Sequence, residues 1–348
     1  MHITTIASPS HEYVIRVRDA EAGLVGFIAI HSTQLGPAAG GLRMRNYETE
    51  DAALNDVLRL SHGMTFKNAA AGLPLGGGKA VIIGDPGTKT PAMLTAFAQA
   101  IDRLKGRYWT AEDMGMTPED MAVLARVTPY VAGQPDGDFA SGDPSPITAQ
   151  GIFNAIRCTA KHRFGTSDLT GRRVAVQGLG HVGWHLARLL RSAGAALVVA
   201  DIGTDRAAEA GAFFGAEIVP VAAILKAEAD ILAPCAIGGI LNAATIPDLN
   251  VRVVAGGANN QLATPADGDR LHARGILYAP DYVANAGGII NVATEILRIS
   301  DRPAFVTRKL AQAEATLQAI LSEAAARNVA PHRMADETVL AQMRVKAA

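Results

Sequence analysis

A glycine-rich loop between two short β-branched runs limits the possible folds of this chain more than any other segment. Val174–Gln177 is followed by GLGHVG at 178–183, an apolar helical stretch through Leu190, and then Ala196–Ala200, which leads into Asp201. This order of strand, glycine loop, helix, strand and acidic residue is the βαβ unit that binds dinucleotides. It predicts an α/β protein with a parallel, doubly wound sheet.

The residue types of this unit fit a dinucleotide. Gly178 permits a tight turn, Gly180 lets the backbone approach a pyrophosphate, and Gly183 lets helix and strand pack closely. Asp201, which lies 23 positions after the first glycine, would accept hydrogen bonds from ribose hydroxyls and repel a 2′-phosphate. NAD is therefore favoured over NADP, although Arg206 is close enough in sequence to weaken that preference. The predicted cofactor-binding residues of this segment are Gly178, Leu179, Gly180, His181, Val182, Gly183 and Asp201.

Two domains are expected in a chain of 348 residues. A stretch rich in Gly, Pro, Asp and Ser at 131–146 indicates a loop or a boundary between them. Strands are predicted at Tyr13–Val17, Leu24–Ile30, Ala80–Ile83, Arg107–Ala111, Val174–Gln177, Ala196–Ala200, Glu217–Val219, Ile231–Leu232, Val251–Ala255 and Ile276–Tyr278. Helices are predicted at Glu48–Leu60, at Pro91–Leu104, near Thr117, and from about Pro303 to the end with an interruption near Pro331.

A second glycine-rich segment, LPLGGGKAVII at 73–83, surrounds a single lysine, Lys79. It is not a phosphate-binding P-loop, because Leu73 stands where that motif has its first glycine, Ala80 follows the lysine, and a strand comes next. Another lysine, Lys67, lies twelve residues earlier in GMTFK. The pKa of an ammonium group falls in apolar surroundings or beside another cation, so one lysine could act as a base while the other binds an anionic group.

Two solvated lysines flanking a turn would be the simpler interpretation, but a solvated lysine needs no cleared space around it. We expect the three glycines to let backbone and substrate come close while Lys79 lies in a nearly dry cleft. Asp113, in TAEDMG at 110–115, is a further candidate because a strand ends there. Catalytic groups collect at strand ends in α/β proteins. The residues alone fit a charged turn equally well.

The composition argues against several functional classes. The formal net charge is −1, which gives no reason to expect a nucleic-acid or anionic-membrane partner. Two cysteines, Cys158 and Cys235, form neither a disulfide framework nor a zinc set, and they fit a reducing cytosol. The first residues lack the pattern of a signal peptide, and no apolar run is long enough to span a membrane. We therefore expect a cytoplasmic protein with no metal site.

Taken together, these segments resemble the glutamate/leucine/phenylalanine/valine dehydrogenase family, and above all its leucine/phenylalanine branch. The similar segments are LGPAAGGLRMRNY at 35–47, MTFKNAAAGLPLGGGKAVI at 64–82, TAEDMG at 110–115, GDPSPITAQG at 142–151, GLGHVG at 178–183, AGGANNQL at 255–262 and DYVANAGGIINVATE at 281–295. Several motifs in the right order are far more specific than one motif alone. The resemblance implies NAD(P)-dependent, reversible oxidative deamination of L-amino acids to 2-oxo acids and ammonia.

The resemblance also implies roles for individual residues. Lys79 matches the catalytic lysine that assists water attack and proton transfer at the iminium carbon. Asp113 matches the acid that exchanges protons with the α-amino group, and Lys67 matches the lysine that binds the α-carboxylate. The other positions that match the substrate site are Gly40, Gly41, Ala39, Met64, Ala111 and Val292. Positions that match segments near the nicotinamide and its ribose are Thr148, Ala236, Ala258, Asn259 and Asn260.

The substrate side chain is expected to be apolar. In the glutamate branch, a lysine and a serine that bind the side-chain carboxylate stand at the positions of Ala39 and Val292. A carboxylate facing these two residues would be buried without a partner, which is costly. Branched-chain and aromatic substrates both remain open, because the small Ala39 suits an aromatic ring whereas Ala111 and Val292 are more typical of the branched-chain enzymes. Alternative interpretations are a dehydrogenase for glutamate or a 2-hydroxy acid, and a non-catalytic NAD-binding regulator.

The resemblance implies a two-domain architecture with a cleft between the domains. Residues 1–143 would form the catalytic, substrate-binding and oligomerisation domain, and residues 144–323 the Rossmann-type NAD-binding domain. Residues 324–348 would form a C-terminal helix that returns toward the first domain. The expected partners are an amino acid or its 2-oxo acid, ammonia, NAD, and further copies of the chain in a homo-oligomer.

Overall fold

The computed structural model describes residues 1–347, with side chains up to Met343. The chain forms two compact units. Unit 1 contains Met1–Pro144, Ile289–Val306 and the segment from Ala341 onward, and unit 2 contains Ser145–Gly288 and Thr307–Leu340. No helix among the described residues is long and apolar enough to cross a membrane.

This division differs from the one expected from sequence. The first boundary falls at Pro144, one residue from the expected position, but the chain returns to unit 1 for Ile289–Val306. A buried carboxylate ties this segment to unit 1: Glu295 accepts hydrogen bonds from Gly133 N at 2.8 Å and Ser141 N at 3.1 Å. The last segment also belongs to unit 1, where Gln34 Nε2 donates to the Met343 carbonyl at 3.0 Å.

Unit 1 is built on a mixed sheet with strand order β1-β2-β3-β6-β4-β7, in which β5 also pairs with β6. The pairs β1–β2, β2–β3 and β3–β6 are antiparallel, whereas β4, β5 and β7 run parallel to their neighbours. The strands are β1 (His2–Thr5), β2 (Tyr13–Asp19), β3 (Leu24–Ser32), β4 (Ala38–Ala39), β5 (Leu42–Arg45), β6 (Gly76–Ile83) and β7 (Tyr108–Trp109).

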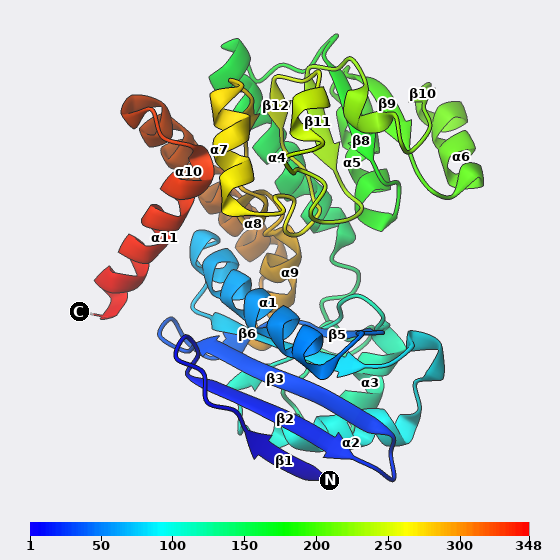
Figure 1. Cartoon of the computed structure of the whole chain (residues 1–348), viewed down its shortest axis with the longest axis vertical. Helices are drawn as coiled ribbons and strands as arrows, with labels where there is room; N and C mark the ends of the chain where they lie inside the picture. The colour runs from blue at the N-terminus through cyan, green and yellow to red at the C-terminus, as the bar shows by residue number, and fades with distance from the viewer. Residues whose placement is uncertain (348) are drawn as a thin grey trace. The chain divides into compact units, whose positions relative to one another are not determined.

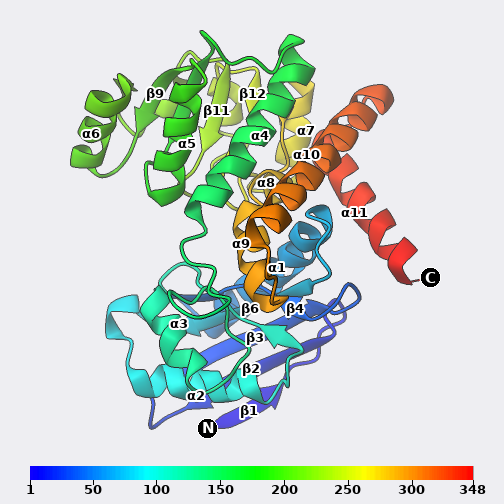
Figure 2. The same cartoon turned by 180° about the vertical axis from the view of Figure 1, so that it is seen from behind.

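Helices cover both faces of this sheet. In Figure 1, α1 (Glu50–Ala70) lies on the near face, and Figure 2 shows α2 (Pro91–Asp102) and α3 (Pro118–Ala125) on the other. Strand residues alternate between the two cores: Ile28 and Ile82 join the core under α2, whereas Phe27 and Val81 join the core under α1. Both faces are buried, so the central strands are apolar at nearly every position.

Helix α1 is longer than the predicted helix at Glu48–Leu60. It begins after Thr49, whose side chain accepts a hydrogen bond from Ala52 N, and Glu50 and Asp51 lie in its first turn. It continues to Ala70 because its second half is buried against β6. It ends where Gly72 adopts φ 62°, a backbone conformation that glycine tolerates.

Unit 2 contains a parallel sheet with strand order β10-β9-β8-β11-β12-β13. The strands are β8 (Arg173–Gln177), β9 (Ala196–Ala200), β10 (Glu217–Ile218), β11 (Ile231–Pro234), β12 (Val253–Val254) and β13 (Leu277–Tyr278). The strand order reverses between β8 and β11, and ligands bind at the carboxyl ends of strands flanking such a switch point. The doubly wound fold predicted from GLGHVG is therefore confirmed.

Helices connect the strands of unit 2, and Figure 2 shows α4 and α5 side by side across one face of the sheet. The helices of the second half of the chain are α4 (Ser145–Phe164), α5 (His181–Ser192), α6 (Thr204–Phe214), α7 (Pro265–Ala273), α8 (Asp281–Ala284), α9 (Gly287–Ile296), α10 (Arg302–Arg327) and α11 (Pro331–Ala347). Short 3₁₀ turns lie at Pro86–Thr88, Ile224–Lys226 and Ile246–Asp248.

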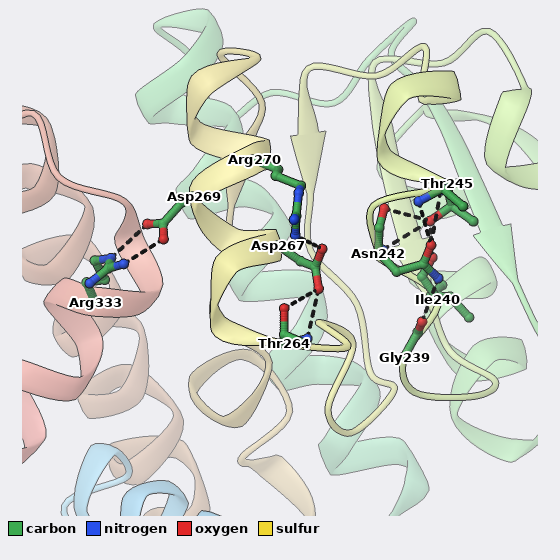
Figure 3. A network of polar contacts seen from close by, with 10 residues as sticks. Gly239, Ile240, Asn242, Thr245, Thr264, Asp267, Asp269, Arg270 and Arg333 are labelled. Atoms are coloured by element: carbon green, nitrogen blue, oxygen red, sulfur yellow. Dashed lines mark hydrogen bonds and ion pairs between the residues drawn. The ribbon is translucent and has the colours of Figure 1, made fainter.

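Polar contacts fix the ends of these elements (Figure 3). Asp267, in the first turn of α7, accepts a hydrogen bond from Arg270 Nη1 at 2.7 Å. Asp269 of the same helix forms a two-point ion pair with Arg333 of α11, at 2.7 and 2.6 Å. Paired hydrogen bonds of this kind fix orientation as well as distance, so α11 begins at a defined place on unit 2.

Candidate active site

Strand β6 directs Lys79 to the α1 side of the sheet in unit 1. Side chains alternate along a strand. Ala80 and Ile82 lie in the core under α2, so Lys79 shares the opposite face with Val81. Lys79 is only 6% exposed. A solvated lysine beside a turn is thereby ruled out, and the predicted buried lysine is found.

The three glycines before Lys79 lie within β6 and are packed against protein atoms. A Cβ on Gly77 would stand 2.0 Å from Thr65 Oγ1 of α1, and a Cβ on Gly78 would stand 2.6 Å from the Tyr108 ring. A Cβ on Gly76 would stand 2.1 Å from the Ser32 carbonyl oxygen. This corrects our expectation that the glycines make room for a substrate: they let α1, β3 and Tyr108 pack onto the strand.

The glycine pair Gly40–Gly41 lies between β6 and the segment that carries Asp113. A Cβ on Gly40 would meet the Gly78 carbonyl oxygen at 2.0 Å and Met64 Cγ at 2.9 Å. A Cβ on Gly41 would meet Asp113 Cβ at 2.8 Å. The pair therefore brings Met64, the backbone next to Lys79 and the Asp113 side chain close together.

Asp113 forms an ion pair with Lys79 in this site. Lys79 Nζ lies 2.9 Å from Asp113 Oδ2, and the same oxygen accepts a hydrogen bond from Arg43 Nε at 3.0 Å. Burial lowers the pKa of Lys79 below its ordinary value, an effect that Asp113 opposes and Arg43 reinforces. Burial alone would raise the pKa of Asp113, but the charges of Lys79 and Arg43 hold that pKa well below its usual range.

Three further residues extend this network, and sequence analysis did not identify them. Arg43 Nη1 donates to Asp56 Oδ2 at 3.2 Å, and the Tyr47 hydroxyl donates to the same oxygen at 2.8 Å. The segment RMRNY at 43–47 contains two of these residues, and Asp56 stands one turn before Arg59 and Leu60 in α1. A signal was present in Asp56, the acidic residue of α1 that lies beyond the first turn, where Glu50 and Asp51 are typical of a helix start.

The remaining predicted substrate residues of unit 1 lie on α1, β4 and α9 and in the loop after β7. Lys67 lies on α1 three positions after Met64, so the two share a face of the helix. Ala39 of β4 and Ala111 are buried, and Ala111 accepts a hydrogen bond from Leu42 N at 2.8 Å. Val292 lies buried on α9.

Helix α9 is tied to the segment beside Ala111. Glu295 accepts hydrogen bonds from Gly133 N and from Ser141, and a Cβ on Gly133 would stand 3.9 Å from the Ala111 Cβ. Val292 therefore sits one turn from a residue that is anchored next to the Asp113 segment. Sequence analysis assigned no role to Glu295, because its partners lie more than 150 positions away, as for Ser141 at 154.

In unit 2, the GLGHVG loop has the predicted geometry. Gly178 adopts φ 91°, and a Cβ on it would meet Ala236 at 2.8 Å, so the loops after β8 and β11 touch. A Cβ on Gly183 would stand 1.9 Å from the Gly178 carbonyl oxygen, which shows the close packing of helix and loop. Gly180 begins α5 without a side-chain cap, and a Cβ there would meet nothing within 4 Å. Its surroundings therefore leave the uncapped helix N-terminus, with His181 and Val182, accessible to a phosphate group.

Asp201 and Arg206 hold Leu179, the second residue of this loop, through its N–H and its carbonyl group. Asp201 Oδ2 accepts a hydrogen bond from Leu179 N at 2.6 Å, and Arg206 Nε donates to the Leu179 carbonyl at 3.0 Å. The Arg206 guanidinium also stacks over the Trp184 ring, 3.7 Å from its centre. Arg206 thus already has partners within the protein, so it is less available to bind a 2′-phosphate.

An apolar cavity of about 460 Å³ opens next to Asp201. Two of its lining residues, Ile202 and Val221, are exposed hydrophobic side chains, at 90% and 42%. The cavity has the apolar lining that suits a planar base beside a ribose acceptor. It is lined by Asp201, Ile202, Thr204, Ala207, Ala208, Ile218, Val219, Pro220 and Val221. Sequence analysis did not identify it, because its lining residues come from two separate segments, 201–208 and 218–221, that only the fold brings together.

The other predicted cofactor residues lie after strands of this sheet, except Thr148, which lies in α4 before β8. The turn Ala258–Asn260 comes after β12, and Asn260 adopts φ 51°. Asn259 Oδ1 accepts a hydrogen bond from Asn285 Nδ2 at 3.0 Å, and Gly239 N donates to the Asn260 carbonyl at 2.7 Å. Thr148 lies in the first turn of α4, and a Cβ on Gly287 would stand 2.8 Å from its Cα. Within the described residues, no group of three or more His, Cys, Asp or Glu side chains could hold a metal ion.

Comparison with known proteins identifies the family. Residues 10–130 match the Glu/Leu/Phe/Val dehydrogenase dimerisation domain, and residues 199–348 match the Glutamate/Leucine/Phenylalanine/Valine dehydrogenase domain. Leucine dehydrogenase of Geobacillus stearothermophilus is 48% identical over 334 residues, which cover 94% of this chain and 90% of that protein. The chain belongs to the Glu/Leu/Phe/Val dehydrogenase family.

Other relatives in the Glu/Leu/Phe/Val dehydrogenase family show the same likeness. Phenylalanine dehydrogenase of Lysinibacillus sphaericus is 47% identical over 295 residues, covering 82% of this chain and 77% of that protein. The crystal structure of L-tryptophan dehydrogenase from Nostoc punctiforme superposes with a TM-score of 0.82 at 40% identity and covers 97% of each chain. The family resemblance predicted from the sequence motifs is therefore confirmed.

Proposed function

We propose that this protein catalyses the NAD-dependent, reversible oxidative deamination of an apolar L-amino acid to its 2-oxo acid and ammonia. The observation that carries the proposal is the buried Lys79–Asp113 pair, at 2.9 Å, in a family of amino-acid dehydrogenases. Relatives of this chain at 43–51% identity are named leucine, phenylalanine and L-tryptophan dehydrogenases. All three names refer to amino acids with apolar side chains.

Lys79 acts as the base in this proposal. Its lowered pKa makes the neutral amine accessible nearer to neutral pH than for an ordinary lysine. The neutral amine accepts a proton from the water that attacks the oxidised α-carbon, and Lys79 is positively charged as the tetrahedral adduct forms. Asp113 contacts both Lys79 and Arg43 through Oδ2. It takes a proton from the substrate α-amino group and returns one to the nitrogen as ammonia leaves.

Lys67 binds the substrate α-carboxylate in this proposal. It lies on the same face of α1 as Met64, whose Cγ would be 2.9 Å from a Cβ on Gly40. A cation that stays charged beside a base also helps to keep the pKa of that base low. In this arrangement Lys67 binds the substrate and Lys79 transfers the proton.

The substrate side chain is apolar in this proposal because Ala39 and Val292 are apolar and buried. A γ-carboxylate would lose its hydration there without gaining a cation or a hydrogen-bond donor from either residue. One methylene group of pocket depth changes specificity by only about 1–3 kcal/mol. The proposal therefore covers leucine-type and phenylalanine-type substrates alike.

The residues of unit 2 fit a dinucleotide, and NAD is the form that we propose. The α5 N-terminus would hold the pyrophosphate, Asp201 the ribose hydroxyls, and the cavity beside Ile202 the adenine. When bound, the nicotinamide ring supplies the acceptor for the hydride that leaves the substrate α-carbon. NAD is favoured because Asp201 is anionic and Arg206 is already engaged with Leu179 and Trp184. We also propose a homo-oligomer, which the match of residues 10–130 to a dimerisation domain supports.

The test is NADH formation, followed by absorbance, from a panel of L-amino acids that includes leucine, valine, phenylalanine, tryptophan and glutamate, with 2-hydroxy acids alongside. Turnover of one or more apolar amino acids and negligible turnover of glutamate and hydroxy acids is the expected result. Preferential oxidation of glutamate would contradict the role of Ala39 and Val292. Oxidation of a hydroxy acid alone, or NAD binding with no turnover, would contradict the reaction itself.

A further inference from the structure

Asp56 is a partly buried carboxylate that the proposed reaction does not use. Its side chain is 12% exposed and lies on α1. Oδ2 accepts hydrogen bonds from Arg43 Nη1 at 3.2 Å and the Tyr47 hydroxyl at 2.8 Å, and Oδ1 accepts one from Arg59 Nη2 at 3.0 Å. Burial alone would raise its pKa, but these donors hold the pKa of Asp56 below its ordinary value, so it is an anion.

Arg43 links this anion to the proposed catalytic pair. Its guanidinium meets two carboxylates through two different nitrogens: Nε donates to Asp113 Oδ2 at 3.0 Å and Nη1 donates to Asp56 Oδ2 at 3.2 Å. The guanidinium is planar and rigid, so fixing one nitrogen fixes the direction of the others. The Arg43 side chain is 9% exposed, and its charge is balanced by these two carboxylates.

We propose that Asp56 is a positioning residue for the reaction: acting through Arg43, it holds the Asp113 carboxylate in place against Lys79. Tyr47 assists by holding Asp56 Oδ2, the oxygen that Arg43 contacts. The inference rests on the proposed function, in which Lys79 and Asp113 exchange protons with substrate and water. It adds a second layer of residues that touch no substrate.

The same arrangement makes Lys79 sensitive to the charge at Asp56. Besides burial, which lowers its pKa, the groups that act on Lys79 are Asp113 and Asp56, which raise it, and Arg43, which lowers it. Strand β6 also packs against α1, which carries Lys67, and β3, which carries His31. Neither of these two is changed in the experiment below, so their contributions cancel between variants.

The experiment measures the pH midpoint of Lys79 in two ways. One is the pH dependence of kcat/KM, and the other is the rate at which acetic anhydride acetylates Lys79 in the folded full-length protein, quantified by mass spectrometry. Asp56→Asn removes an anion and should lower the midpoint by roughly 0.5–1 pH unit. Arg43→Met removes a cation and should raise it. Asp51→Asn, the same charge change in the exposed first turn of α1, should leave it unchanged.

Two conservative variants test positioning apart from charge. Asp56→Glu and Tyr47→Phe keep every charge, so the Lys79 midpoint should stay within about 0.3 pH unit of the unmodified protein. Both should lower kcat several-fold, because Arg43 and therefore Asp113 are held less firmly. The dissociation constant for NAD should not change, since unit 2 is untouched.

The proposal is overturned by an unchanged midpoint in Asp56→Asn, by an equal shift in Asp51→Asn, or by shifts of the same sign in Asp56→Asn and Arg43→Met. If Asp56→Asn does not fold, unchanged kcat values in Asp56→Glu and Tyr47→Phe overturn it. Failure of the proposed function looks different: the unmodified protein would then oxidise no amino acid, while the acetylation midpoints would still report the coupling of Asp56 to Lys79.

Discussion

Gly77 lies where helix α1 packs on the strand that carries the proposed catalytic residue Lys79. Its missing side chain lets α1 contact β6 through Thr65 and Ser61, with a Cβ 2.0 Å from Thr65 Oγ1 and 2.6 Å from the Ser61 carbonyl oxygen. The same helix carries Lys67 and Asp56, and the same strand carries Lys79. The spacing between the two lysines therefore depends on a glycine that touches neither of them.

We predict that Gly77→Ala destabilises the protein by about 2–4 kcal/mol, because backbone atoms of α1 must move to admit the methyl group. Denaturant unfolding measures the loss. Gly63→Ala is the matched control, because Gly63 lies on the same helix and a Cβ there would meet nothing within 4 Å. The control should be neutral or slightly stabilising, through helix propensity. Equal destabilisation of both variants would show that contact with β6 is not the cause.

At this scale, sequence alone predicted candidate residues for the chemistry and missed the residues that hold them in place. Lys79 and the glycine loop at 178–183 stand in local motifs whose residue types suggest a role, and Asp113 stands in a motif that the family resemblance interprets. Arg43, Asp56 and Glu295 could not be found in that way, because each acts through partners that only the fold brings near. The three glycines show the limit most plainly: their spacing suggested access for a substrate, and their neighbours proved to be α1, β3 and Tyr108.

At the scale of elements, α1 packs on β3 through a cluster of histidines. His31 Nδ1 lies 2.8 Å from Thr65 Oγ1, and its ring lies 5.0 Å from the His11 ring and 4.6 Å from the His62 ring. Burial lowers the pKa of His31 to about 4, with His62 and His11 adding to the effect. Burial likewise lowers the pKa values of His11 and His62. The folded protein therefore binds protons here less readily than the unfolded chain.

Because the folded pKa of His31 is depressed, its neutral form contributes stability that is present above about pH 6.5 and lost as the pH falls toward 4. We predict that His31→Gln reduces the loss of unfolding free energy between pH 7 and pH 5 by about 1 kcal/mol, after allowance for solvent screening. Urea unfolding at the two pH values measures it. His2→Gln, on the exposed strand β1, should leave the loss unchanged. An unchanged pH dependence in His31→Gln would show that His31 does not contribute to the loss of stability at low pH.

Element boundaries were largely predictable, and their errors have a physical pattern. Ala196–Ala200 was placed as observed, and β8 and β11 differ from prediction by one or two residues. Helix α4 (Ser145–Phe164) was not predicted at all, and the largest boundary error among the predicted elements was α1, which extends ten residues beyond the predicted end at Leu60. Its second half carries Gly63, Thr65 and Asn68, which weaken helix propensity, and burial against β6 stabilises it instead.

At the scale of the whole molecule, the chain forms two units, and each unit contains more than one segment of the sequence. A contiguous division at residue 143 follows naturally from composition, because the Gly- and Pro-rich stretch at 131–146 is visible in the sequence. The return of Ile289–Val306 to unit 1 is not visible, because it depends on long-range contacts. Glu295 makes those contacts, with Arg302 Nη2 donating to the Ser141 carbonyl at 2.9 Å beside it.

We predict that Glu295→Ala destabilises unit 1 by about 2–3 kcal/mol, because Gly133 N and Ser141 N would be left without their buried acceptor. Hydrogen exchange should speed up across 133–141 and leave β6 protected. Exposed Glu48→Ala is the control and should change neither stability nor exchange. If exchange at 133–141 stayed slow in Glu295→Ala, some other contact would have to hold this segment.

The match to the family covers nearly the whole chain, and the proposed function depends on one chemical assignment, that of Lys79 as the base of an amino-acid dehydrogenase. Its most direct test is NADH formation by Lys79→Ala with the best substrate of the panel, measured beside the dissociation constant for NAD. We predict that turnover falls by at least about three orders of magnitude while the dissociation constant stays unchanged. Turnover close to that of the unmodified protein would contradict the account.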